Sequence, residues 1–94
     1  TIIPAPGETY GHQIVRVHSD GETLYCLGDL YHHAVEYDHP EWAVTWANLE
    51  IIIATRKEFV PRALTENAIL TATHIIKLGR FHETPAGIRW QPLD

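Results

Sequence analysis

Two histidines and one aspartate, His12, Asp29 and His74, lie where predicted strands begin or end. Imidazole and carboxylate groups are common ligands of zinc, iron and manganese in proteins. If the three strand ends share one edge of a sheet, these side chains could hold a divalent ion with open positions for water. The sequence therefore predicts a metal site at this edge. The alternative is that Asp29 caps a turn or a helix and that both histidines are ordinary hydrogen-bonded side chains.

A predicted hairpin brings the first two of these residues together. Residues 23–28 are apolar on both faces, which is typical of a strand inside a layered sheet. Residues 13–18 form the preceding strand, and the Asp-Gly pair at 20–21 is a strong signal for a tight turn. Because the open ends of a hairpin's two strands are adjacent, His12 and Asp29 are predicted to lie close together.

A helix and a second buried strand bring in the third residue. Asn48 is the predicted N-cap of a helix with an apolar stripe, with Arg56 on its outer face and a break or kink at Pro61. Residues 68–73 then read as a strand that ends at His74. The order strand, helix, strand predicts a parallel pair, which brings this histidine to the same edge as the aspartate.

Composition sets limits on the class of protein. The 94 residues suit one small α/β domain, 1–94, with a mixed sheet, one main helix and a terminal hairpin. A net charge of −5 argues against binding to nucleic acid or to anionic membranes. No apolar run is long enough to span a bilayer. A single cysteine cannot form an internal disulfide, so we expect a reducing compartment, the cytoplasm.

The order of these motifs resembles the C-terminal half of the metallo-β-lactamase-fold hydrolases. Residues 6–13, Pro-Gly-Glu-Thr-Tyr-Gly-His-Gln, are similar to the family's Pro-Gly-His-Thr-Pro-Gly-His segment. Residues 27–30 resemble its Gly-Asp segment, and residues 72–74 resemble the strand that ends on its last ligand histidine. Segments 28–33, 39–42, 78–80 and 88–93 also fit one subgroup of the family. The resemblance implies half of an αββα sandwich.

The resemblance also implies roles for the three residues. His12 would complete a first metal site, Asp29 would bridge two metals as the catalytic carboxylate, and His74 would serve the second. The metal is zinc or another divalent ion, and the family's hydroxide attacks an ester, lactone, thioester, amide or phosphoester. Glu8 and Tyr10 replace a histidine and a proline of the loop motif, and the family's His-x-His-x-Asp-His segment has no counterpart in this chain.

Three hypotheses of different class follow. The chain is one part of a metallohydrolase that needs its N-terminal half and acts on a small molecule. Alternatively, it is a half-fold that pairs with a second copy as a homodimer and has no hydrolase activity. In the third, His12, Asp29 and His74 hold a single ion in a mononuclear site.

Three residues after the aspartate are further candidates. Tyr31, His32 and His33 follow Asp29 closely and could reach the same edge, where they would contact substrate or support the metal ligands. Tyr31 could donate a hydrogen bond to a substrate oxygen. The alternative is that both histidines are solvent-exposed loop side chains.

Overall fold

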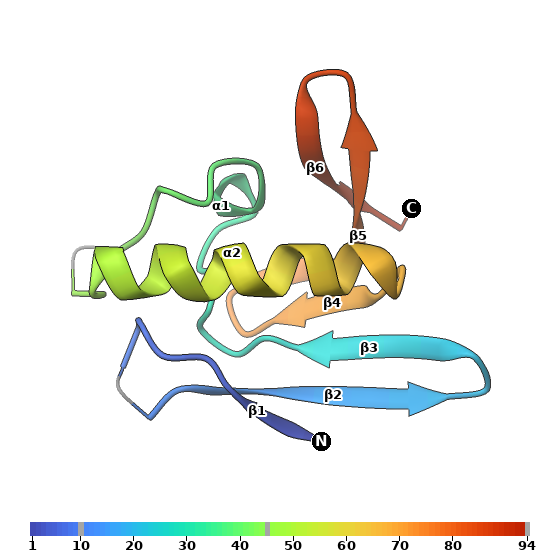
Figure 1. Cartoon of the computed structure of the whole chain (residues 1–94), viewed down its shortest axis with the longest axis horizontal. Coiled ribbons are helices and arrows are strands. Elements are labelled where there is room, and N and C mark those ends of the chain that lie inside the picture. Colours follow the sequence, from blue (N-terminus) through green and yellow to red (C-terminus); the bar gives the residue numbers. More distant parts are fainter. Residues whose placement is uncertain (10, 45, 94) are drawn as a thin grey trace.

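The chain folds into one mixed sheet with a single long helix packed on one face (Figure 1). The computed structural model describes residues 1–9, 11–44 and 46–93; Tyr10, and with it the altered proline position of the loop motif, lies outside the described residues. Neighbouring strands in the sheet follow the order β1-β2-β3-β4-β5-β6. The elements are β1 (Ile2–Pro4), β2 (Gln13–Ser19), β3 (Glu22–Cys26), α1 (Val35–Asp38), α2 (Leu49–Thr65), β4 (Ile69–Ala72), β5 (Ile75–Thr84) and β6 (Gly87–Pro92).

The predicted hairpin between β2 and β3 is confirmed. The two strands pair antiparallel from Val15 opposite Cys26 to Ser19 opposite Glu22. The turn between them has positive backbone φ at two successive residues, +52° at Asp20 and +79° at Gly21. Aspartate and glycine tolerate this left-handed geometry, which matches the twist of the flanking strands.

The parallel pairing of β3 with β4 is also confirmed, with Leu24 opposite Ile69 and Cys26 opposite Thr71. Helix α2 connects the two strands and lies across the sheet in Figure 1. Both strands therefore end at the same edge. The predicted terminal hairpin is confirmed and is formed by β5, Ile75–Thr84, and β6, Gly87–Pro92.

Helix α2 begins as predicted, at Asn48. The Asn48 side chain accepts a hydrogen bond from the backbone N–H of Ile51 at 3.1 Å, and Asn67, just beyond the last turn, has a φ of +49°.

A break or kink was predicted at Pro61, and the break is wrong, because the helix continues to Thr65. Both Pro61 and Lys57 are exposed, so water can satisfy the Lys57 carbonyl that the proline leaves without an N–H donor.

The two faces of the sheet differ in their cover. Side chains that face α2 are buried; those on β3, β4 and β5 are Tyr25, Leu70, Ala72 and Phe81. The opposite face, which we call the open face, carries a row of apolar side chains that no described segment covers: Val15, Val17, Leu24, Cys26 and Ile69. Val15 is 39% exposed and Val17 46%. Residues 23–28 were predicted to be buried on both faces, and the described chain buries only one.

No helix in the described part of the chain is both long and apolar enough to cross a membrane.

Candidate metal centre

Backbone hydrogen bonds continue past the ends of β3 and β4 and fix the edge where the candidate residues lie. The N–H of Leu27 donates to the carbonyl of Thr71 at 2.8 Å, and the N–H of Thr73 donates to the carbonyl of Gly28 at 3.0 Å. Asp29 follows Gly28 and His74 follows Thr73, so these bonds hold Asp29 and His74 side by side. The parallel register therefore sets the distance between the two side chains.

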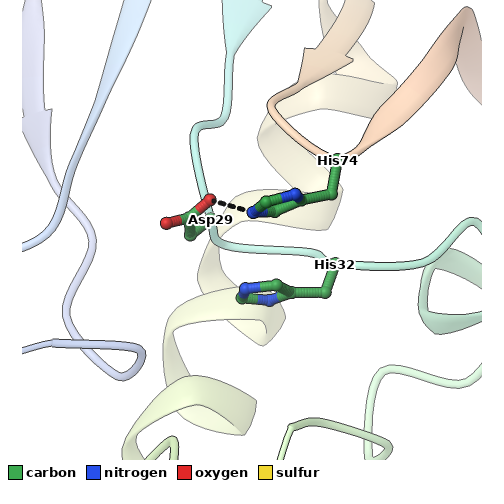
Figure 2. Close-up of side chains that lie close together, drawn as sticks. All are labelled: Asp29, His32 and His74. Atoms are coloured by element: carbon green, nitrogen blue, oxygen red, sulfur yellow. Dashed lines mark ion pairs between the residues drawn. The ribbon is translucent and has the colours of Figure 1, made fainter.

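Asp29 and His74 face each other across this edge (Figure 2). Oδ1 of Asp29 lies 3.4 Å from Nε2 of His74, which is within ion-pairing distance when the imidazole is protonated. The His74 side chain is 54% exposed and that of Asp29 33% exposed, so the edge is open to solvent on the histidine side.

His32 joins this pair. One donor atom from each of Asp29, His32 and His74 can be chosen so that all three lie within 4.8 Å of one another. The rings of His32 and His74 stack, with centroids 5.0 Å apart and planes 14° apart, as Figure 2 shows. We call these three residues the edge cluster. It contains two of the three predicted ligands and one residue that the sequence predicted only as a supporting contact.

The edge cluster contains buried polar atoms without partners. Among the described residues, neither Oδ1 of Asp29 nor Nδ1 of His32 has a hydrogen-bond partner, although both atoms are buried. A buried polar atom that makes no hydrogen bond costs about 1–3 kcal/mol. Because carboxylate oxygen and imidazole nitrogen are metal donors, these atoms fit a divalent ion.

His12 lies beside the edge cluster but not in it. Its Nδ1 donates to the carbonyl of Ala5 at 2.9 Å, and its Nε2 accepts the backbone N–H of Asp29 at 2.9 Å. These bonds fix the tautomer, with the proton on Nδ1 and the Nε2 lone pair accepting the Asp29 N–H. The hairpin thus brings His12 to the backbone of Asp29, and the structure does not bring its ring together with the carboxylate and His74.

Comparison with solved structures identifies the fold. Over all of its residues the chain superposes on AidC, a dizinc quorum-quenching lactonase solved with the product N-hexnoyl-L-homoserine (TM-score 0.86, 28% identity, 33% of AidC covered). It also matches the hydrolase AbOPH of the β-lactamase superfamily (TM-score 0.87, 22% identity, 100% of this chain and 34% of AbOPH). A third match is a probable metal-dependent hydrolase from Staphylococcus aureus (TM-score 0.78, 14% identity, 99% and 35% covered).

This chain has the fold of one half of the metallo-β-lactamase-fold hydrolases. It spans about a third of the length of each of these hydrolases. No protein-family model matches the sequence, and no curated protein matches it.

Two other predicted candidates lie away from the edge cluster of this metallo-β-lactamase fold. Tyr31 is fully buried and packs against the ring of Tyr37 and the guanidinium of Arg56. Burial raises the pKa of its phenol. His33 is exposed. The structure therefore places Tyr31 in the core and His33 at the surface, and neither at the edge.

A buried arginine holds the loop that carries His32. The prediction that Arg56 lies on the outer face of the helix is wrong, since its side chain is 0% exposed. Its five N–H groups donate to the carbonyls of Leu30 (twice), Pro40 and Trp42 and to Oε1 of Glu36. Burial lowers the pKa of Arg56, and the nearby Glu36 carboxylate opposes that shift.

The same glutamate holds His32. Oε1 of Glu36 accepts the backbone N–H of His32 at 2.8 Å as well as a hydrogen bond from Arg56 at 3.0 Å. The loop from Leu30 to Trp42 is thus tied to α2 at both ends. A sequence signal for this role exists, because Arg56 lies four residues after Ile52 and three before Phe59, on the apolar stripe.

A hollow of about 350 Å³ lies next to the edge cluster, on the open face. It is lined by residues that include Val15, Cys26, Gly28 and Thr73, the last two being neighbours of Asp29 and His74. A larger hollow of about 370 Å³ lies beside Arg56 and contains no member of the edge cluster. The space that adjoins the candidate metal ligands is therefore on the face that the described chain leaves uncovered.

Proposed function

We propose that this chain is the C-terminal part of a metal-dependent hydrolase that cleaves an ester or lactone bond in a small molecule. The observation that carries the proposal is the facing pair of Asp29 and His74, with an unpartnered buried carboxylate oxygen, on a metallo-β-lactamase fold. The lactonase activity of AidC, which is 28% identical, supports the substrate class. Zinc is the proposed metal because AidC is described as a dizinc enzyme.

The chain's own residues have separate tasks in this proposal. Asp29 and His74 would hold the ion, and a bound divalent ion supplies Lewis-acid activation of water and of a carbonyl. The Nδ1 bond to Ala5 orients the ring of His12, and its Nε2 accepts the backbone N–H of Asp29 and so holds the residue that carries the carboxylate. Asp29 therefore lies between two imidazoles, one near its carboxylate and one at its backbone.

We also propose that the rest of the hydrolase covers the open face. The chain accounts for about a third of the length of its structural neighbours, and three of its strands, β2, β3 and β4, carry apolar side chains on that face. Monomeric proteins rarely leave such a patch exposed. A covering segment would also close the hollow next to the edge cluster. We also propose a cytoplasmic location, because the single cysteine cannot form an internal disulfide.

Metal analysis and a hydrolysis assay test the function. The complete hydrolase that contains this chain, purified without a histidine tag, should contain zinc and should hydrolyse an acyl-homoserine lactone or a chromogenic ester, with the activity lost in chelator. Asp29→Asn keeps the side-chain size and should lower metal content and activity at least about 10-fold. Asp20→Asn is the matched control, since asparagine tolerates the left-handed turn. The proposal would be refuted if the purified wild-type hydrolase contained no metal and showed no hydrolysis that chelator abolishes.

Native mass tests the partner. A homodimer in which two open faces pack together is the competing arrangement, and it is favoured by the same apolar row. If Val17→Lys converts a dimer of this chain into monomers, the second copy is the occupant. If the chain instead binds a separately made N-terminal segment of the hydrolase and Val17→Lys prevents this, our proposal is supported.

A further inference from the structure

We propose that the indole of Trp46 binds the apolar chain of the substrate beside the edge cluster, and that Glu8 positions this indole. Trp46 is then a specificity-determining residue and Glu8 a positioning residue. The inference rests on the proposed function, because it names the group that recognises the apolar part of an ester or lactone. Two contacts that Trp46 makes with residues distant in the sequence, His32 and Glu8, carry it.

Trp46 lies one ring away from the facing pair of Asp29 and His74. Its ring is perpendicular to that of His32, with centroids 5.5 Å apart. The His32 ring stacks in turn on that of His74, with centroids 5.0 Å apart. A carbonyl bound next to Asp29 and His74 therefore has an aromatic surface within reach of the chain attached to it. Acyl-homoserine lactones and chromogenic esters both carry such an apolar chain next to the reacting carbonyl.

Most of the Trp46 side chain is open to solvent. Trp46 is 64% exposed, whereas His32 is only 8% exposed. An exposed indole offers a large apolar area to a ligand, and the free energy gained grows with each methylene group of the ligand that covers it. The surface of Trp46 therefore favours substrates with longer chains.

Glu8 fixes the orientation of this indole. The Nε1 N–H of Trp46 donates to Oε2 of Glu8 at 2.9 Å, across 38 positions of the sequence. Glu8 stands where the loop motif of the metallo-β-lactamase-fold hydrolases has a histidine, and its carboxylate gives the N–H an anionic acceptor. The departure at position 8 thus has a role in this structure.

The loop that carries Glu8 is tied to the start of α2, next to Trp46. The backbone N–H of Asn48 donates to the carbonyl of Gly7 at 2.8 Å. Gly7 packs so closely on the helix that a Cβ on it would lie 2.6 Å from Cα of Ile52. A surface that is ordered before binding loses little conformational entropy when a ligand covers it.

Steady-state kinetics of the complete hydrolase with N-butanoyl- and N-decanoyl-homoserine lactone test the inference. Trp46→Ala should raise KM for the decanoyl lactone at least about 10-fold and for the butanoyl lactone less than about 2-fold. Because the lost contact is equal in the ground state and the transition state, kcat should stay within about 2-fold. Trp46→Phe keeps part of the aromatic surface and should raise the decanoyl KM about 3-fold.

Trp42→Ala is the matched control. Trp42 is 51% exposed, and its ring stacks on that of His39, with centroids 4.1 Å apart. The variant should keep the wild-type KM for both lactones.

The role of Glu8 is tested by a pair of variants. Glu8→Ala should raise the decanoyl KM about 3-fold, because the indole loses its acceptor, and Glu8→Gln should restore it, because the amide keeps an acceptor oxygen. An equal fall in kcat/KM for the two lactones in Glu8→Ala would contradict the positioning of Trp46.

Equal changes in KM for the two lactones in Trp46→Ala, or no change for either, overturn the inference and leave the proposed function intact. If Trp46→Ala does not fold, the wild-type KM for both lactones in Trp46→Phe overturns it as well. Calorimetric titration with the ring-opened product, N-decanoyl-homoserine, separates the two proposals because it does not use hydrolysis. Product binding that Trp46→Ala weakens, in a protein that hydrolyses neither lactone, would support the inference and reject the proposed function. A wild-type protein that binds no decanoyl product overturns the inference.

Discussion

Two buried polar regions lie within the same fold and differ in how completely they are satisfied. Around Arg56, all five guanidinium N–H groups have acceptors and the charge is paired with Glu36. In the edge cluster, neither Asp29 Oδ1 nor His32 Nδ1 has a hydrogen-bond partner among the described residues, and the Asp29 oxygen has only the ion-pair contact with His74. The chain thus completes one polar network and leaves the other incomplete.

The difference separates structure from function. A satisfied network that is fully buried fixes a conformation, here that of the loop from Leu30 to Trp42. Buried polar atoms without hydrogen bonds cost stability unless a ligand binds them. We therefore infer that the Arg56 region supports the loop and that the edge cluster is the proposed binding site. Glu36 joins the two, because it contacts both Arg56 and His32.

Removing the arginine should give the largest effect. Arg56→Met leaves the Glu36 carboxylate unpaired and several loop carbonyls without donors, so we expect the free energy of unfolding to fall by about 3–5 kcal/mol. Urea unfolding of the metal-free protein measures this. Lys57→Met, an exposed neighbour on the same helix, should change stability by less than about 0.5 kcal/mol. Equal small effects in both variants would mean that Arg56 is not the support.

Metal should stabilise the protein through the edge cluster. At a free Zn²⁺ concentration 100 times the dissociation constant, binding to the native state alone adds about 2.7 kcal/mol to the free energy of unfolding. Thermal unfolding with zinc and with chelator measures the gain. It should vanish in Asp29→Asn and persist in Asp20→Asn. A gain of the same size in Asp29→Asn would place the ion elsewhere.

A methyl group at Gly28 should disturb the contact between His12 and Asp29. Gly28 has a φ of +54°, and a Cβ there would lie 2.9 Å from Nε2 of His12. We expect Gly28→Ala to cost on the order of 1–3 kcal/mol of stability. At Gly11 a Cβ meets no described atom within 4 Å, so Gly11→Ala is the control. Unfolding curves that superpose for the two variants would contradict the tight packing.

The smallest effect is expected at a half-exposed pair, Arg16 and Glu66, which joins β2 to the end of α2. Hydrogen bonds, first from Arg16 and then from Tyr25, hold the pKa of Glu66 below its ordinary value. The stabilisation of the native state by ionised Glu66 is therefore present above the unfolded pKa of glutamate, about 4.3. It is lost as the pH falls through the lower pKa of the folded state. Unfolding free energies at pH 7 and pH 3 should differ less in Glu66→Gln than in the wild type, whereas equal differences would contradict this.

Much of the fold could be predicted because its signals are local. The Asp-Gly turn specifies the hairpin, and Asn48 and Asn67 mark the ends of the helix. The strand, helix, strand order then gives the parallel pair that brings Asp29 and His74 to one edge. The distance between these two residues follows from sheet register, which hydrophobic pattern and turn type together set.

The place of His32 could not be predicted, since no local signal fixes its loop. Its conformation depends on Arg56, which lies 24 residues further along the chain and was expected at the surface. A charged residue on an apolar stripe allows two interpretations. Its side chain either extends along the apolar surface until the charge reaches water, or is buried with every donor paired. The contacts of Arg56 with Leu30, Pro40 and Trp42 settle the choice, and they are visible only in three dimensions.

The cysteine on the open face has a practical consequence. Cys26 is a free, half-buried thiol in the middle strands of the sheet, between Val15 on β2 and Thr71 on β4. A thiol-reactive reagent should label it slowly or not at all when another polypeptide lies over that surface, and faster when nothing does. The molecule thus carries its own chemical reporter of assembly, which can be followed by mass spectrometry.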